Sequence, residues 1–316
     1  MRFVLDDAPW SNADLPKQEL EESLDSLTDR LQIIRKRKEG ISIYDGIWDI
    51  ALVGSDSLTS LLYDADNRRN LHRDVRQRLI RQMDQISSNT FSDTSLTDFT
   101  ATVAGSPLLA PSAVHAWQEA QDNKNIACLT PKSSGRVGML PVTVATGPTL
   151  HIHYVNSNSS HLDFFRELIT TENADDTTFA QFAKSAFPDL HFAENTWRGL
   201  RNFSRPFRER REAVVHHLSV LNDHGSRIFA MREHLLIERE FQALGISIST
   251  ETKETIDDNH YCSFRKMKYS GDFLVFDWHM KIEPHIDRIH IHPGTKSSEG
   301  SVIVGIFTSH LPLPGD

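Results

Sequence analysis

Apolar residues recur at helical spacing along most of the chain before residue 245. In residues 16–39 the apolar positions alternate in steps of four and three, which aligns one stripe on a helix. This stripe consists of Leu20, Leu24, Leu27, Leu31 and Ile34. Similar stripes predict helices over residues 71–86 and 112–121 and several more between 161 and 244, while short apolar runs within residues 125–155 predict strands.

Two polar segments interrupt the helical pattern. The stretch "SSNTFSDTSLTDFT" is rich in serine, threonine and aspartate, so residues 87–104 are expected to form a mobile linker. Further along, "LNDHG" ends at Gly225. Because glycine commonly follows the last turn of a helix, we expect one helix to end there and an antiparallel partner to begin.

After residue 245 the apolar period changes from helical to alternating. The runs "YCSFRKMKY", "DFLVFDWHMKI", "IDRIHIH" and "SVIVGIFTSHL" are separated by short turns and predict four antiparallel strands. The expected fold class is therefore α+β. A mainly helical region with a few short strands, residues 1–245, is expected to precede a β-rich C-terminal module, residues 246–316.

Alternation within two of these runs separates an apolar face from a basic one. In the first run Trp278 belongs to the apolar face, whereas His279 and Lys281 point to the other side. In the next run Arg288 and His290 point away from two isoleucines. If the two strands are neighbours, the four polar residues lie together on the face that does not form the core.

A surface of clustered histidine, lysine and arginine suits the cleavage of a phosphodiester without a metal. Histidine transfers protons near neutral pH, and lysine or arginine stabilises the charge that develops on phosphate. The candidate catalytic residues are therefore His279, Lys281, Arg288 and His290, and no cofactor is expected. An ordinary solvated sheet face is the alternative interpretation.

A metal site competes with this interpretation. The sequence His-Ile-His occurs at residues 151–153 and again at 290–292. Alternate residues of a strand point the same way, so such a pair can bind one ion. The second pair is followed by further ligand types, and the alternative metal ligands are His290, His292, Glu299 and His310.

Arginines concentrate in "RGLRNFSRPFRERRE", with two phenylalanines between them. Guanidinium groups bind phosphate in a forked geometry, and aromatic rings can stack on bases. The candidate nucleic-acid-binding residues are Arg198, Arg201, Arg205, Arg208, Lys266 and Lys268. The alternative is the start of a helix whose arginines pair with the many acidic residues of the chain.

Composition limits the class of protein. A length of 316 residues suggests about two domains. The net charge of −9 argues against coating DNA with the whole surface but leaves room for a local basic site. Two cysteines exclude a disulfide framework and favour the cytoplasm. Neither a secretory signal nor a membrane-spanning stretch is expected.

The segments "FDWHMKI", "DRIHIHP" and "VIVGIFTSHLPLP" resemble the small β modules of bacterial toxin and anti-phage proteins, of which the RelE-type messenger-RNA interferases are members. The resemblance covers the C-terminal module alone and implies RNA cleavage without a metal. We therefore expect a nucleic-acid-acting component of a bacterial anti-phage or toxin–antitoxin system, with a protein partner encoded nearby. A non-enzymatic assembly or regulatory subunit of a defence complex is the alternative, and self-association is left open.

Overall fold

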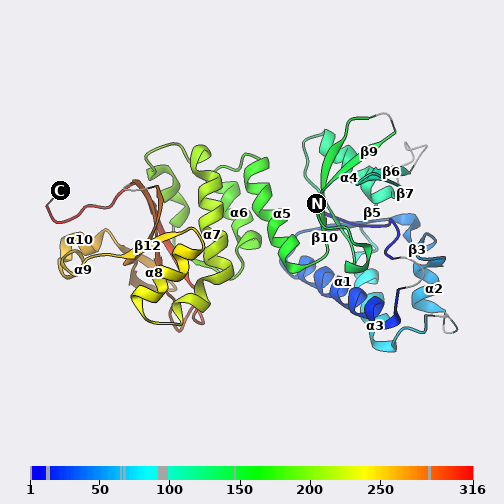
Figure 1. Cartoon of the computed structure of the whole chain (residues 1–316), viewed down its shortest axis with the longest axis horizontal. Helices are drawn as coiled ribbons and strands as arrows, with labels where there is room; N and C mark the ends of the chain where they lie inside the picture. Colours follow the sequence, from blue (N-terminus) through cyan, green and yellow to red (C-terminus); the bar gives the residue numbers. More distant parts are fainter. Residues whose placement is uncertain are drawn as a thin grey trace. The chain divides into compact units, whose positions relative to one another are not determined.

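The structure, a computed structural model, describes residues 2–11, 15–64, 66, 69–91, 99–145, 147–283 and 286–315. Its fold class is α+β, as the sequence predicted, with an antiparallel sheet in the C-terminal part. The chain divides into two compact units, Met1–Phe164 and Phe165–Asp316, which we name unit 1 and unit 2. Each unit contains its own sheet (Figure 1).

Unit 1 is built on a mixed sheet. Its strands are β1 (Phe3–Leu5), β2 (Ile41–Tyr44), β3 (Ala51–Val53), β4 (Asp56–Ser57), β5 (Thr90–Phe91), β6 (Thr100–Val103), β7 (Ser106–Leu109), β8 (Ala127–Leu129), β9 (Gly138–Val144) and β10 (Leu150–Val155). Eight of them form one sheet in the order β5-β2-β1-β8-β10-β9-β6-β7. Neighbours from β5 to β10 are parallel, and β9, β6 and β7 continue the sheet antiparallel.

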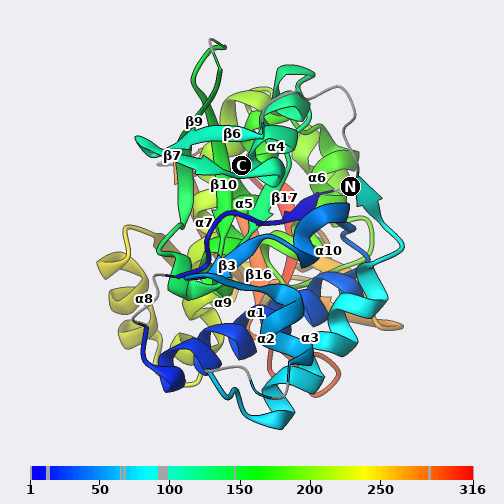
Figure 2. The same cartoon turned by 90° about the vertical axis from the view of Figure 1, so that its right-hand side faces the viewer.

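Helices cover both faces of this sheet. They are α1 (Lys17–Arg37), α2 (Leu58–Tyr63), α3 (Arg73–Ile86), α4 (Pro111–Gln121) and α5 (Asn158–Thr171), with 3-10 turns η1 (Asp45–Trp48) and η2 (Lys132–Ser134). Helix α4 lies on the side opposite α1 and α3 (Figure 2). Alternation along β1 explains the two layers, because Val4 belongs to the core cluster beneath α4 while Phe3 packs against Phe164 of α5.

The predicted helices of unit 1 are confirmed, whereas the predicted linker is wrong in part. All five apolar residues of the α1 stripe are buried. Within residues 87–104, however, the structure forms β5 and β6, and β6 pairs with both β7 and β9. Ala101 and Val103 are buried at alternate positions of β6. The apolar residues of this threonine-rich segment thus have the two-residue period of a strand with one buried face. Residues 92–98 lie outside the described part of the chain.

Unit 2 contains a second sheet, and its helices lie before and between the strands of this sheet along the sequence. Its helices are α6 (Asp176–Ala186), α7 (Phe207–Phe229), α8 (His234–Ala243), α9 (Lys253–Asp257) and α10 (Asn259–Ser263), with the 3-10 turn η3 (Thr196–Asn202). Its strands are β11 (His191–Phe192), β12 (Ser247–Thr250), β13 (Lys266–Tyr269), β14 (Asp272–Val275), β15 (Trp278–Glu283), β16 (Ile286–His292) and β17 (Ile303–Thr308). Five strands form a sheet in the order β11-β17-β16-β15-β12, and β13 pairs with β14 in a separate hairpin.

The C-terminal sheet includes β11, which precedes residue 246 in the sequence. The observed boundary between the two parts of the chain therefore differs from the boundary expected at residues 245 and 246. Strand β11 pairs in parallel with β17, at the edge of the sheet. The rings of Phe229 and His234 lie 5.4 and 4.9 Å from the ring of Trp278 on β15. Helices assigned by sequence to the first region therefore build the core of the β module, and the units divide at residues 164 and 165.

Gly225 lies inside a helix instead of ending one. Helix α7 continues through it to Phe229, and the turn to α8 follows, with Arg232 at φ 61°. A Cβ at Gly225 would lie 3.2 Å from side-chain atoms of Leu221 and Val302, so the glycine permits close packing. Among the described residues, no helix combines the length and apolarity that crossing a membrane requires.

Candidate functional site

The structure brings the two predicted catalytic histidines together but buries both. His279 and His290 face one another across β15 and β16, as alternation predicted. Only 4% of His279 and 0% of His290 is exposed, so the predicted solvent exposure is wrong. Trp278, on the opposite side of β15, is buried too, so this part of the sheet is covered on both faces.

The cover over the histidines comes from residues that flank α9 and α10. Glu251 Oε1 lies 3.4 Å from His279 Nδ1 and 3.8 Å from His290 Nδ1. The Arg265 Nε atom lies 3.1 Å from the same oxygen, and the Arg265 side chain is fully buried. We name Glu251, Arg265, His279 and His290 the buried histidine cluster. Sequence analysis missed its two charged members because nothing in the strand pattern indicates what packs onto a face.

Electrostatics within the buried histidine cluster favour neutral imidazoles beside a charged carboxylate. Burial lowers the pKa of His290 to about 3 and also lowers the pKa of His279. Burial alone would raise the pKa of Glu251, but its contacts with His279 and Arg265 outweigh this effect and bring the pKa to about 2. The cluster therefore carries one ion pair, Glu251 with Arg265, between two uncharged rings.

The same cluster changes the candidate metal site. Among the described residues, one group of three potential ligands lies within 4.8 Å, and it consists of Glu251, His279 and His290. His290 belongs to it as predicted, but the other predicted ligands, His292, Glu299 and His310, do not. Two histidines and one carboxylate are a familiar ligand set, and His290 Nδ1 donates to the Phe276 carbonyl oxygen, as ligating histidines commonly do.

Against metal binding stands the guanidinium of Arg265. It occupies the Glu251 oxygen that an ion would need, and a second positive charge beside it is costly. Several buried polar atoms of the cluster lack hydrogen bonds, including His290 Nε2 and Arg265 Nη2. The cluster therefore retains unused donors and acceptors in a place that the surface does not reach.

Lys281 and Arg288, the other predicted catalytic residues, form the next cross-strand pair of the same face. Both are half-buried. Burial lowers the pKa of the Arg288 guanidinium, and its Nε atom is buried without a hydrogen bond. The four residues thus share a face as predicted. Their exposure differs along the strands, because the two histidines are buried and the two cationic side chains are half-buried.

The arginine segment lies at the start of α7 and lines a cavity in unit 2. This cavity has a volume of about 740 Å³. Arg201 lies in η3, Arg205 precedes α7, and Arg208 lies in its first turn. These three line the cavity, and the further predicted residues Arg198, Lys266 and Lys268 do not, although all three are exposed.

Sequence analysis missed the part that Arg210 and Arg211 play at this cavity. Arg210 is buried and forms ion pairs with Glu283 and Asp287. Asp287 also accepts hydrogen bonds from Ser204 N and Oγ, so this network holds the segment before α7 in place. Arg211 is 8% exposed and lines the cavity, with its Nε atom buried and without a hydrogen bond.

Charges around the cavity leave two arginines available to a ligand. Arg201 pairs with Asp176 across the cavity wall. Arg208 lies 4.0 Å from Glu209 with both side chains exposed, a contact that contributes little. Within the described part of the chain, neither Arg205 nor Arg211 has an ion pair, but Arg211 is buried, so Arg205 and Arg208 are the exposed arginines with the least neutralised charge.

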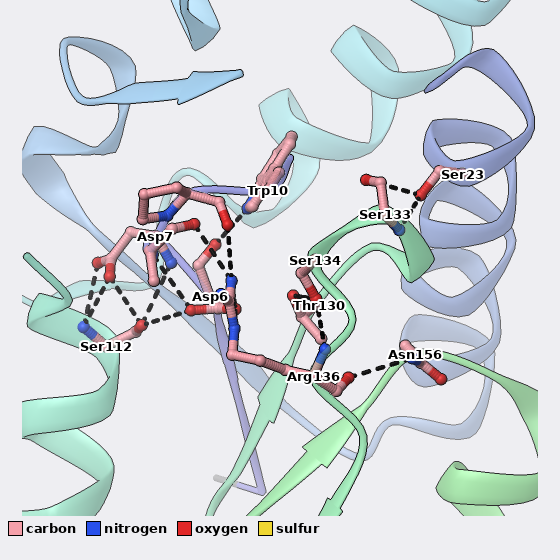
Figure 3. A network of polar contacts seen from close by, with 12 residues as sticks. Asp6, Asp7, Trp10, Ser23, Ser112, Thr130, Ser133, Ser134, Arg136 and Asn156 are labelled. Atoms are coloured by element: carbon pink, nitrogen blue, oxygen red, sulfur yellow. Dashed lines mark hydrogen bonds and ion pairs between the residues drawn. The ribbon is translucent and has the colours of Figure 1, made fainter. Parts of the chain in front are cut away.

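A second polar network, in unit 1, lies where parallel strands end (Figure 3). Asp6 and Asp7 follow β1, Thr130 follows β8 and Asn156 follows β10. Because parallel strands end at the same edge, these residues and Arg136 come together there. Sequence analysis did not select them, although the pair of aspartates directly after the apolar run "FVL" is a signal for this arrangement.

The two aspartates have different partners. Asp6 accepts from Arg136 Nε at 2.9 Å and from Nη2 at 2.6 Å. Asp7 accepts from the Ser112 backbone N–H and hydroxyl, at the first turn of α4. Burial raises the pKa of Asp7 to about 7, although the hydrogen bonds from Ser112 act in the opposite direction.

Comparison with protein-family models, with curated proteins and with solved structures gave no match. The arginine segment of unit 2 and the polar network of unit 1 each border a cavity.

Proposed function

We propose that the protein binds nucleic acid through unit 2, as a nucleic-acid-acting component of a bacterial anti-phage or toxin–antitoxin system. The observation that carries this proposal is the cavity lined by Arg205, Arg208 and Arg211 at the start of α7. The resemblance of the C-terminal sequence to toxin β modules supports the choice of nucleic acid among anionic ligands.

The start of α7 adds to the attraction for phosphate. The helix spans 23 residues, and its N-cap residue, Pro206, provides no side-chain hydrogen bond to the N-terminal N–H groups. Such an end carries a partial positive charge, which favours an anion. Arg205 and Arg208 stand beside that end with exposed side chains. Backbone phosphates of a strand therefore meet both a dipole and two guanidinium forks.

The phenylalanines of the segment are held by packing against other rings of unit 2. Phe203 is largely buried, with its ring 6.0 Å from the ring of Phe307. Phe207 packs 5.2 Å from Phe179. Both rings also line the cavity, but packing leaves them little free area for base stacking, which the sequence suggested. Binding is expected to depend on phosphate contacts, and hence on salt, more than on base sequence.

Titration of the full-length protein into labelled single-stranded RNA and duplex DNA at several salt concentrations tests the proposal. The double variant Arg205→Gln/Arg208→Gln should weaken binding and lower the salt slope by about two, since each phosphate contact contributes about one. The matched control is Arg239→Gln/Lys253→Gln, which removes the same charge from exposed positions of unit 2. Absence of binding at low salt, or equal losses in both variants, would contradict the proposal.

Cleavage of the bound strand is a separate part of the proposal. The candidate catalytic residues are Lys281, Arg288 and the two buried histidines, so cleavage requires movement of Glu251 and Arg265 away from the histidines. Incubation of RNA with and without EDTA tests it directly. Products that persist with EDTA and vanish in His290→Gln are expected for metal-independent cleavage, while intact RNA throughout would limit unit 2 to binding.

A non-enzymatic assembly subunit of a defence complex is the competing proposal, and it too requires a protein partner encoded nearby. Co-purification with the products of neighbouring genes tests that partner, and the mass of the purified chain in solution tests self-association. We propose a cytoplasmic location, which two free cysteines, Cys128 and Cys262, support.

A further inference from the structure

The order of strands in unit 1 creates a crevice between β1 and β8. The chain leaves β1 toward β2 on one side and leaves β8 toward β10 on the other, so the two following loops separate. Crevices of this kind, at the carboxyl ends of parallel strands, are where open α/β sheets bind ligands. The loop after β1 carries Asp6 and Ser11, and the loop after β8 carries Ser133, Ser134 and Arg136 (Figure 3).

A cavity of about 440 Å³ lies at this crevice. That volume is within the range of small-molecule sites. Its polar lining consists of Ser11, Ser106, Ser133, Ser134 and Arg136. Its apolar lining comes from β6, β7 and β9 and includes Val103, Leu108 and Leu140. A ligand with one polar end and one apolar or planar end fits a cavity whose lining is polar on one side and apolar on the other.

The polar lining offers hydrogen-bond donors that the protein does not use. Ser11 is 8% exposed, and its hydroxyl has no hydrogen-bond partner among the residues that the structure describes. Ser134 Oγ accepts from Thr130 and from the Arg136 backbone N–H, so its own hydrogen is free to donate. Ser133 Oγ likewise accepts from Ser23. Three hydroxyl donors therefore border one cavity.

Arg136 adds a charged donor that is fixed in position. Its Nε and Nη2 atoms bind Asp6, and Nη2 also donates to the Pro9 carbonyl oxygen at 3.0 Å. Among the described residues, Nη1 makes no hydrogen bond, and 11% of the Arg136 side chain is exposed. The Asp6 carboxylate is occupied by Arg136, and Asp7 is turned toward Ser112. The acidic groups nearby are thus engaged elsewhere, while the donors remain.

We propose that unit 1 binds a small organic oxyanion in this cavity, with the anionic group at Arg136 and Ser11 and the apolar body against Leu108 and Leu140. Carboxylates and phosphate monoesters share the necessary chemistry, since both accept hydrogen bonds from a guanidinium and from hydroxyls. The volume sets an upper limit near the size of a mononucleotide. This site is independent of nucleic-acid binding by unit 2.

Calorimetric titration of the Arg205→Gln/Arg208→Gln protein tests the proposal without interference from the arginine cavity. The probes are adenosine 5′-monophosphate, benzoate and inorganic phosphate. Binding of the first alone identifies a phosphate ester, and binding of the second alone identifies a carboxylate. Inorganic phosphate lacks the apolar body and should bind at least tenfold more weakly than adenosine monophosphate in the first case.

Two variants locate the binding. Ser11→Ala should weaken it about tenfold, because a hydrogen bond to a charged group is lost, and it should leave the melting temperature unchanged. Ser106→Glu places a negative charge at an exposed position of the cavity wall and should weaken binding further, whereas the matched control Ser106→Gln should not. Failure of all three probes at millimolar concentration, or binding that Ser11→Ala and Ser106→Glu leave unchanged, would overturn the proposal.

Discussion

Replacing Asp7 by asparagine is expected to remove a pH dependence from the stability of unit 1. The Asp7 side chain is fully buried, and burial raises its pKa to about 7, from a value of 3.8 for an exposed aspartate. Between these two values the folded chain keeps a proton that the unfolded chain releases. The free energy of unfolding therefore falls as pH rises from 4 through 7.

The expected size of this effect follows from the two pKa values. At 1.36 kcal/mol for each pH unit, the interval from 3.8 to about 7 corresponds to about 4 kcal/mol lost between pH 4 and pH 8. Asparagine is neutral at every pH and keeps an oxygen that can accept from the Ser112 N–H and hydroxyl. Asp7→Asn should therefore be the more stable protein at pH 8, with the difference shrinking toward pH 5.

Urea titrations at pH 5, 6, 7 and 8 measure this directly. Trp10 is buried in unit 1 and donates to the Asp6 carbonyl oxygen, so its fluorescence reports on the same region. Asp49→Asn is the matched control, since it makes the same change at an exposed site of unit 1. Parallel pH dependences for Asp7→Asn and the natural chain would show that Asp7 is ionised in the folded state, and the reasoning would fail.

Three further perturbations address unit 2. Arg210→Met should lower the free energy of unfolding by about 3 kcal/mol in urea titrations, because Asp287 remains buried without its cation. Gly305→Ala should cost about 1–3 kcal/mol by the same measurement, since a Cβ there would lie 2.3 Å from the ring of Phe276. One equivalent of zinc should leave the melting temperature of untagged protein unchanged, because Arg265 occupies the Glu251 carboxylate; a rise of several degrees would instead establish a metal site in the buried histidine cluster.

Local patterns predicted the elements of this fold well where one period dominates a segment. The stripe of α1 is an example, since all five of its apolar residues are buried as expected. In β16 the alternation correctly placed Ile289 and Ile291 in the core, although His290 on the other face is buried as well. Gly225 and the threonines around Ala101 show the opposite case. Local preference alone predicts a helix end at Gly225 and a linker around Ala101. Tertiary packing overrides both preferences, because Val302 packs against the glycine within a continuous helix and β9 pairs with β6.

The candidate sites show a related limit. Alternation correctly placed His279 beside His290, because the side-chain period of a strand is a property of the backbone. Their burial depends on Glu251 and Arg265, which come from a polar segment that no periodic pattern links to the sheet. Asp6 and Arg136 are separated by 130 positions and meet only because β1 and β8 are neighbours.

The burial of the histidine cluster also restricts the proposed action of unit 2 on nucleic acid. A phosphate at Arg205 and Arg208 is held by exposed side chains and needs no rearrangement. A phosphate at His279 or His290 needs the Glu251–Arg265 ion pair to separate, and that step exposes two charges together with two neutral rings. Binding and cleavage are therefore expected to have separate requirements. Variants of the arginines should change affinity at every pH. Glu251→Gln, which removes the ion pair, should leave affinity unchanged and alter only cleavage, if cleavage occurs.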